Sequence, residues 1–108
     1  MKKYINIKAI SPLDGRYHAQ VAELRGYFSE AALMWFRVQV ELRWLVFMCN
    51  HLRLPGTRKL SKKEQAVFEV IYKKFGENEA LRIKKIEETT NHDVKAVEYF
   101  IKEQLTGT

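Results

Sequence analysis

The chain has 108 residues, of which 46% are hydrophobic and 12% aromatic. This length suffices for one modest domain with a core and excludes two, and the apolar content excludes a disordered polypeptide. The net charge of +6, from 19 basic and 13 acidic residues, favours an anionic partner such as a nucleic acid, a membrane surface or a phosphorylated and carboxylated metabolite. The single cysteine, Cys49, excludes an internal disulfide framework and a cysteine-based zinc site, and favours a reducing cytoplasm.

The first 18 residues are predicted to form a mostly irregular arm, because Ser11-Pro12 and Asp14-Gly15 are turn dipeptides. In its structural role, this turn reverses the chain before the first helix. In a functional role, it fixes Arg16 and Tyr17, whose guanidinium and phenol groups suit phosphate oxygens. The residues by themselves favour the structural role.

Two helices are predicted next. A short one covers Ala19 to Arg25 and ends near Gly26, and Ser29 caps a long one from Glu30 to His51. The long helix has apolar residues on two sides, which predicts that it is sandwiched between neighbours as the spine of the domain. The two stripes are Leu33, Phe36, Val40, Trp44 and Phe47, and Trp35, Val38, Leu42, Leu45 and Cys49.

The same long helix carries polar residues between its two apolar stripes. Arg37 stands four residues before Glu41, and Gln39 stands four residues before Arg43, so each pair is expected to meet along the helix. This polar content excludes a membrane span.

Three more helices complete the predicted domain. A capping box of Ser61 and Glu64 opens a helix that runs from Lys62 to about Phe75, and Gly76 ends it. Residues 77–88 and about 91–105 form the last two helices. No segment alternates with a period of two residues, so strands are not needed. The fold class is therefore all-α, with residues 1–108 forming a single domain.

A run of short polar residues, Thr89-Thr90-Asn91-His92-Asp93, opens the last helix. Thr90 is a suitable N-cap, and Asp93 three residues later completes a pair that resembles a capping box. Unpaired backbone N–H groups at such a terminus attract anions, and His92 adds a group that titrates near neutral pH. The run therefore indicates an anion site with an acid/base group, although helix capping alone uses the same residue types.

The literal string Thr-Thr-Asn-His-Asp-Val-Lys-Ala-Val-Glu-Tyr, residues 89–99, resembles the first signature region of the adenylosuccinate lyases, in the fumarase/aspartase superfamily. Residues 11–17, Ser-Pro-Leu-Asp-Gly-Arg-Tyr, are similar to that family's N-terminal motif. Two matches in the right order are far more specific than either alone. The resemblance identifies residues 1–108 as the N-terminal domain of a longer lyase.

The resemblance implies an activity and a set of contacts. Adenylosuccinate lyases release fumarate from adenylosuccinate to give AMP, and from the related imidazole-carboxamide succinyl intermediate earlier in purine synthesis. Arg16 and Tyr17 would bind the phosphate. Asn91, His92 and Asp93 would line the nucleotide side of the pocket, with His92 a polar contact or an aid in protonation. The resemblance implies a cytoplasmic homotetramer, and we expect no metal and no cofactor.

The same resemblance places the main acid and base outside this chain. The family's second histidine region and its Gly-Ser-Ser loop, which supplies the serine base, are absent from the sequence. In the superfamily, each active site draws residues from three subunits. We therefore expect this polypeptide to be a fragment that binds substrate and is inactive alone.

Two other functions remain open from the sequence. One is a different superfamily lyase, such as argininosuccinate lyase or fumarase, although Arg16-Tyr17 after Asp14-Gly15 favours the nucleotide-handling branch. The other is a non-enzymatic helical module that binds nucleic acid. Such a module predicts a concentrated stripe of Lys and Arg on one helix. The basic residues here are scattered along the chain, which favours neither a nucleic acid nor a membrane as the partner.

We predict that purified residues 1–108 show no lyase activity, because the proposed serine base and its loop are missing. The measurement is the absorbance change on cleavage of adenylosuccinate. Turnover above a buffer control would contradict the prediction.

Overall fold

The computed structural model describes residues 6–106, and all regular secondary structure in that range is helical. The elements in chain order are η1 (Ala22–Leu24), α1 (Arg25–Phe28), α2 (Glu30–Val46), η2 (Phe47–Leu52), α3 (Lys62–Lys74), α4 (Glu77–Thr90) and α5 (Asp93–Thr106). The all-α prediction is confirmed. No helix in the described range is long and apolar enough to cross a membrane. The sequence also predicts that Gly107 marks the end of the last helix, and this residue lies outside the described range.

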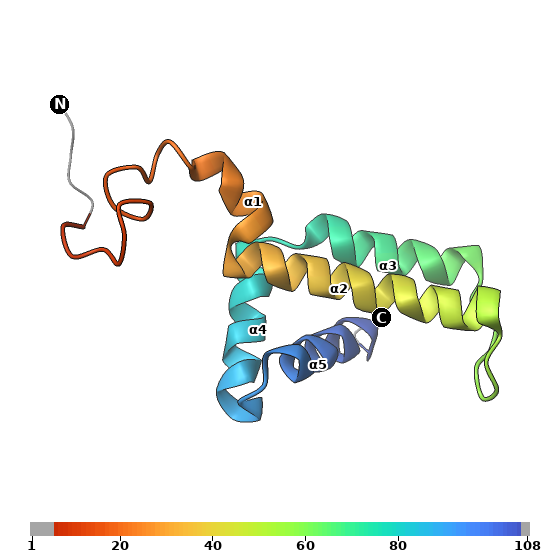
Figure 1. Ribbon diagram of the computed structural model, residues 1–108. Helices are drawn as coiled ribbons and strands as arrows, with labels where there is room; N and C mark the ends of the chain where they lie inside the picture. The colour runs from red at the N-terminus through yellow and green to blue at the C-terminus, as the bar shows by residue number, and fades with distance from the viewer. Residues whose placement is uncertain (1–5, 107–108) are drawn as a thin grey trace.

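Helix α2 is the centre of the molecule, since α1, α3, α4 and α5 all pack against it. Figure 1 shows α3 lying beside α2, while α4 turns away from both and α5 returns beneath α2. Val38 and Leu42 of α2 are buried almost completely, as are Val97 and Phe100 of α5. These four side chains belong to one apolar cluster. The prediction that the long helix is the spine is therefore confirmed.

The predicted burial of α2 on two sides is wrong within the described residues. The stripe that contains Val38 and Leu42 lies in the core, but the opposite stripe stays exposed, from 39% at Phe36 to 66% at Val40. Leu81 of α4 is also exposed, at 58%, whereas Ala80 and Ile83 of the same helix are buried. The other helices cover one side of α2, so its second apolar stripe is left facing solvent.

Residues 6–18 of the N-terminal arm form no regular helix or strand, as predicted, and they extend away from the helical body (Figure 1). Its turn is closed by the carbonyl of Pro12, which accepts the N–H groups of Gly15 at 3.2 Å and Tyr17 at 2.9 Å. The Asp14 carboxylate accepts the Ser11 N–H at 2.9 Å, and this bond lowers the pKa of Asp14. The short helix predicted over residues 19–25 instead forms as η1 and α1, and Gly26 lies inside α1.

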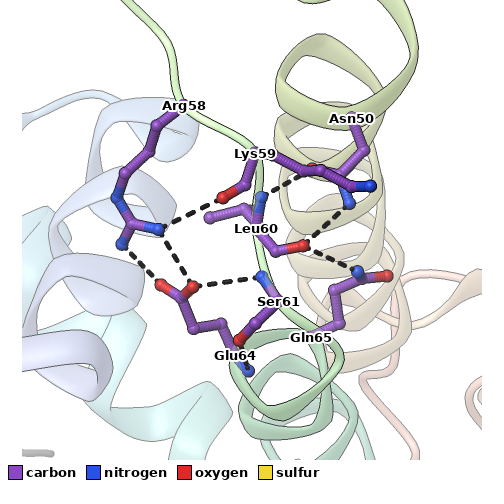
Figure 2. A network of polar contacts seen from close by, with 7 residues as sticks. All are labelled: Asn50, Arg58, Lys59, Leu60, Ser61, Glu64 and Gln65. Carbon is purple, nitrogen blue, oxygen red and sulfur yellow. Dashed lines mark hydrogen bonds and ion pairs between the residues drawn. The ribbon is translucent and has the colours of Figure 1, made fainter.

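A polar network fastens the loop before α3 to the far end of the long helix (Figure 2). The side-chain amide of Asn50 in η2 makes two hydrogen bonds with the backbone of Leu60. It accepts the Leu60 N–H at 2.7 Å and donates to the Leu60 carbonyl at 3.0 Å. The Ser61–Glu64 capping box forms as predicted. Arg58 also donates to the Glu64 carboxylate at 2.9 Å. The network fixes where α3 begins, because side chains of η2 and of the first turn of α3 hold residues 58–61, the last part of the loop.

The turn between α4 and α5 differs from the prediction. Thr90 is not the N-cap of the last helix, because α4 runs through Thr90 and ends at Asn91, which is left-handed with φ 52° and ψ 31°. His92 caps α5 instead: its carbonyl accepts the Ala96 N–H at 3.0 Å, and its Nδ1 accepts the Lys95 N–H at 3.1 Å. Asn tolerates the left-handed region better than most residues, so the chain reverses within two residues.

Replacing Glu64 by Gln is predicted to flatten the acid limb of the stability curve. Chiefly the hydrogen bonds from Arg58, and then that from the Ser61 backbone, lower the pKa of Glu64 from 4.5 to about 2. The folded state thus prefers the ionised carboxylate, so its stabilising contribution is present above pH 4.5 and is lost as the pH falls towards 2.

The measurement is the melting temperature of both proteins between pH 2 and pH 6, at low and high salt. Salt should weaken the effect, because both side chains are partly exposed. Parallel curves for the two proteins would show that this contact contributes nothing.

Substitutions of Asn91 are predicted to separate backbone conformation from side-chain identity. Asn91→Ala places a residue with a β-carbon and no local polar group at φ 52°, which costs about 1 kcal/mol. Asn91→Gly relieves that steric restriction. The melting temperature, measured by thermal unfolding, should fall by about 4–8 °C in the Ala variant and stay closer to wild type in the Gly variant. Equal loss in both variants would show that the amide side chain, not the backbone angle, stabilises the turn.

Candidate functional site

A pocket of about 360 Å³ lies where the first half of α2 faces the α4–α5 turn. Its lining residues come from three elements: Glu30, Leu33, Met34 and Arg37 from α2, Glu87 from α4, and Asn91, His92 and Asp93 from the turn and the start of α5. The structure therefore brings the predicted residues Asn91, His92 and Asp93 together on one pocket. The three residues alone do not form the pocket, because its other wall comes from α2.

That wall is joined to the turn by Arg37. Its guanidinium lies 3.1 Å from a carboxylate oxygen of Asp93, and the two side chains are 35% and 53% exposed. An ion pair this exposed contributes little to stability. It does fix direction, because it points the Asp93 carboxylate toward α2 across the pocket. The expected pairing of Arg37 with Glu41 is replaced by this contact between helices.

His92 is held by its own helix. The Lys95 N–H donates to Nδ1 at 3.1 Å, and Nδ1 lies 3.9 Å from the nearer oxygen of Asp93. The His92 side chain is 62% exposed, so the ring reaches the pocket from its rim. On the preceding side, the Thr90 hydroxyl accepts the His92 N–H at 3.2 Å and donates to the His92 carbonyl at 3.0 Å. Both sides of the residue are thus fixed by local contacts.

The rest of the rim is acidic and is bridged by a lysine. Lys84 Nζ lies 3.0 Å from Glu87 and 3.6 Å from Glu30. These contacts raise the pKa of Lys84, chiefly through the hydrogen bond to Glu87 and then through the charge of Glu30. Among the lining side chains, three carboxylates therefore face one guanidinium. The pocket favours hydrogen-bond donors and neutral polar groups over a bare anion.

Arg16 and Tyr17 are not brought to this pocket. They lie in the arm, which Figure 1 shows projecting away from the body, while the α4–α5 turn lies at the foot of α4, below α2. The Arg16 guanidinium lies over the ring of Tyr17, 4.8 Å from its centroid. The two side chains thus meet each other, but neither is among the residues that line the pocket.

Reasoning from the sequence missed the contribution of Arg37, Glu30 and Glu87 to this pocket. Arg37 has an acidic residue four positions on, and that local partner masked the partner from α5. The placement of Arg37 next to the buried Val38 and Met34 was the available signal, because a residue bordering the core stripe faces a neighbouring helix. Within residues 6–106, no cluster of three or more His, Cys, Asp or Glu side chains is placed to hold a metal ion.

Comparison with known proteins adds an independent line of observation. No protein-family model matches the chain. Individual proteins do: adenylosuccinate lyase of Escherichia coli K12 is 48% identical over 100 residues, which cover 93% of this chain and 22% of that protein. The Haemophilus influenzae lyase is 50% identical over 99 residues, or 92% of this chain, and that of Dictyostelium discoideum is 48% identical over 101 residues, or 93%. Each of these alignments also covers 22% of the relative.

The chain thus spans about a fifth of the length of the curated relatives that it matches. The similarity extends over nearly the whole chain, including both the arm motif and the α4–α5 turn, in a bacterium and in a eukaryote alike. Identity of this extent between two folded segments reflects common ancestry. This chain is therefore a homologue of one part of the adenylosuccinate lyases.

Proposed function

We propose that this chain forms a substrate-binding part of an adenylosuccinate lyase that cleaves adenylosuccinate to AMP and fumarate in purine nucleotide biosynthesis. The same protein would also release fumarate from the succinyl-aminoimidazole-carboxamide ribotide. The observation that carries the proposal is the joining of Asn91, His92 and Asp93 to Arg37 around one pocket, in a chain about half identical to proteins of that name.

The reaction would be a β-elimination, in which a base removes a proton beside a carboxylate and an acid protonates the departing nitrogen. The groups on this chain are suited to binding and orientation. Arg37 and Asp93 neutralise each other across the pocket, and His92 Nδ1 is occupied by the first turn of α5. The main acid and base would come from outside residues 1–108, so this polypeptide alone would be inactive.

The charge of the pocket limits which part of the substrate it would receive. Glu30, Glu87 and Asp93 would repel a phosphate or a succinyl carboxylate. A ribose hydroxyl or another neutral polar group of the nucleotide would instead find both donors and acceptors there. Asn91 and His92 would supply the donors, and the carboxylates would accept from hydroxyl groups.

The phosphate would bind to Arg16 and Tyr17 of the arm. The closed turn at Pro12 places the two residues side by side, and the guanidinium already lies over the phenol ring. A guanidinium offers paired N–H donors that match phosphate oxygens. Because the arm and the pocket of one chain lie apart, one nucleotide would meet both only where they come from different subunits. The arm of one subunit would then bind the anionic end of the nucleotide and the pocket of another its neutral part.

The assembly and location follow the same proposal. The enzyme would be a cytoplasmic homotetramer that needs no cofactor and whose partners include neither nucleic acid nor membrane. The buried free thiol of Cys49 is compatible with a reducing compartment. The absence of a concentrated basic stripe in the sequence supports a small anionic metabolite over a nucleic acid.

The pocket is tested in the full-length lyase with Asn91→Gly, which keeps the left-handed turn accessible and removes the amide. We expect kcat/KM for adenylosuccinate to fall roughly tenfold, the loss of one polar contact to substrate, while the melting temperature stays near wild type. As a control, Asn78→Gly removes an exposed amide in the first turn of α4, outside the pocket. Unchanged kinetics in Asn91→Gly would remove Asn91 from the binding site.

The arm is tested by Arg16→Ala. Loss of a charge-assisted contact to phosphate is worth about 1.5–3 kcal/mol, which corresponds to a fall in kcat/KM of roughly 10- to 150-fold. Folding should be unaffected, because Arg16 is exposed and its side chain contacts the neighbouring Tyr17 ring. Lys63→Ala, which removes an exposed cation from α3, controls for net charge. Wild-type KM and kcat/KM in Arg16→Ala would show that Arg16 is a surface residue.

A further inference from the structure

The cap of α5 determines the protonation state of a side chain in the pocket. A backbone N–H can only donate, so the Lys95 N–H at 3.1 Å from His92 Nδ1 requires a lone pair on that nitrogen. A proton on Nδ1 would place one N–H against another. The capped ring is therefore the neutral tautomer, with its single proton on Nε2.

The orientation of the ring is determined by the same bond. A half-turn of the imidazole would exchange Nδ1 for a carbon and leave the Lys95 N–H without an acceptor. That N–H is one of the donors in the first turn of a helix that have no partner within the helix itself. His92 Nδ1 is the acceptor for this N–H, so the Nδ1 side of the ring faces α5. Nε2, on the other side of the ring, therefore points away from α5.

The carboxylates around the ring are all engaged in ion pairs. Asp93 lies 3.9 Å from Nδ1, but its other carboxylate oxygen is held by Arg37 at 3.1 Å. Of the acidic residues on the opposite rim, Glu30 and Glu87 both share Lys84. Asp93 is thus paired with Arg37, and Glu30 and Glu87 share one lysine, so each of these carboxylates already has a cationic partner.

Nε2 is the group that remains available to a ligand. Across residues 6–106, the hydrogen bonds of the His92 side chain involve Nδ1 alone, and the ring lines the pocket. Resting on the proposed function, we propose that His92 acts there as a neutral hydrogen-bond donor through Nε2–H. Its ligand is an acceptor atom of the nucleotide, such as a ring nitrogen or a ribose oxygen.

This assignment separates two roles that histidine is able to play. An imidazolium transfers a proton at neutral pH, but the capped neutral ring would have to become an imidazolate to do so. His92 therefore orients the substrate, and the acid that protonates the departing nitrogen is another group. The helix cap and the ligand contact use opposite nitrogens of one ring, so binding a nucleotide does not require α5 to lose its cap.

The tautomer is tested directly by long-range ¹H–¹⁵N correlation spectra of the full chain labelled at its three histidines. His18 is an internal reference, because its Nε2 meets the Arg25 guanidinium, which can only donate. We expect His92 to carry its proton on Nε2 and His18 on Nδ1, so the two patterns are opposite at pH 8. A His92 proton on Nδ1, or on both nitrogens, would overturn the proposal.

The ligand contact is tested by His92→Asn in the full-length lyase. Asn is a preferred N-cap whose side-chain oxygen accepts the Lys95 N–H, so the cap survives while the distal donor is lost. We expect an unchanged melting temperature, a fall in kcat/KM on the order of tenfold, and an unaltered shape of the pH–rate profile. His51→Asn, at the exposed histidine stacked on Phe47, is the matched control and should behave as wild type.

The outcomes distinguish the alternatives. A fall of 10²- to 10⁴-fold in His92→Asn with loss of one limb of the profile would identify a proton-transfer role and overturn the donor assignment. Wild-type kcat/KM would overturn the ligand contact. Failure of the full-length protein to cleave adenylosuccinate at all would instead refute the proposed function, and the tautomer measurement does not depend on that activity.

Discussion

The structure depends on the contact between the buried stripe of α2 and helix α5. Val38 and Leu42 meet Ala96, Val97 and Phe100 in one cluster, and each of these side chains is at most 1% exposed. Complete burial of a large apolar side chain contributes about 1.5–3 kcal/mol. The packing of α5 against α2 determines where the α4–α5 turn lies.

The candidate pocket follows from that contact. Once α5 is fixed against the middle of α2, its first residue, Asp93, faces Arg37, the residue directly before the buried Val38. The turn that precedes α5 then faces the first half of α2, and Glu87 and Lys84 of α4 come within reach of Glu30. The polar pocket thus lies directly beside the apolar core, and the packing of the core determines its position. Its own ion pairs are too exposed to position the helices.

The two ends of α2 are organised by different means. At the pocket, short local hydrogen bonds around Thr90 and His92 set the turn. At the far end, Asn50 and the Arg58–Glu64 pair hold the loop before α3 (Figure 2). Between them, the second stripe of α2 presents exposed aromatic residues, among them Trp44 stacked on Phe47. An exposed apolar row of this length is unusual for a complete soluble domain, and the chain spans about a fifth of its relatives.

The sequence by itself determined the fold class, most helix bounds, and the two caps formed by Ser29 and Ser61, because periodicity and capping are local properties. It also pointed to Asn91, His92 and Asp93 as one group, through adjacency and a family resemblance. It misplaced the cap at Thr90, since the sequence does not say whether α4 stops before that residue or, as found, at Asn91. Only the tertiary structure decided that Arg37 pairs with Asp93 and that one stripe of α2 stays exposed. Both depend on which side of α2 the later helices cover, and that choice is made by contacts between residues far apart in the chain.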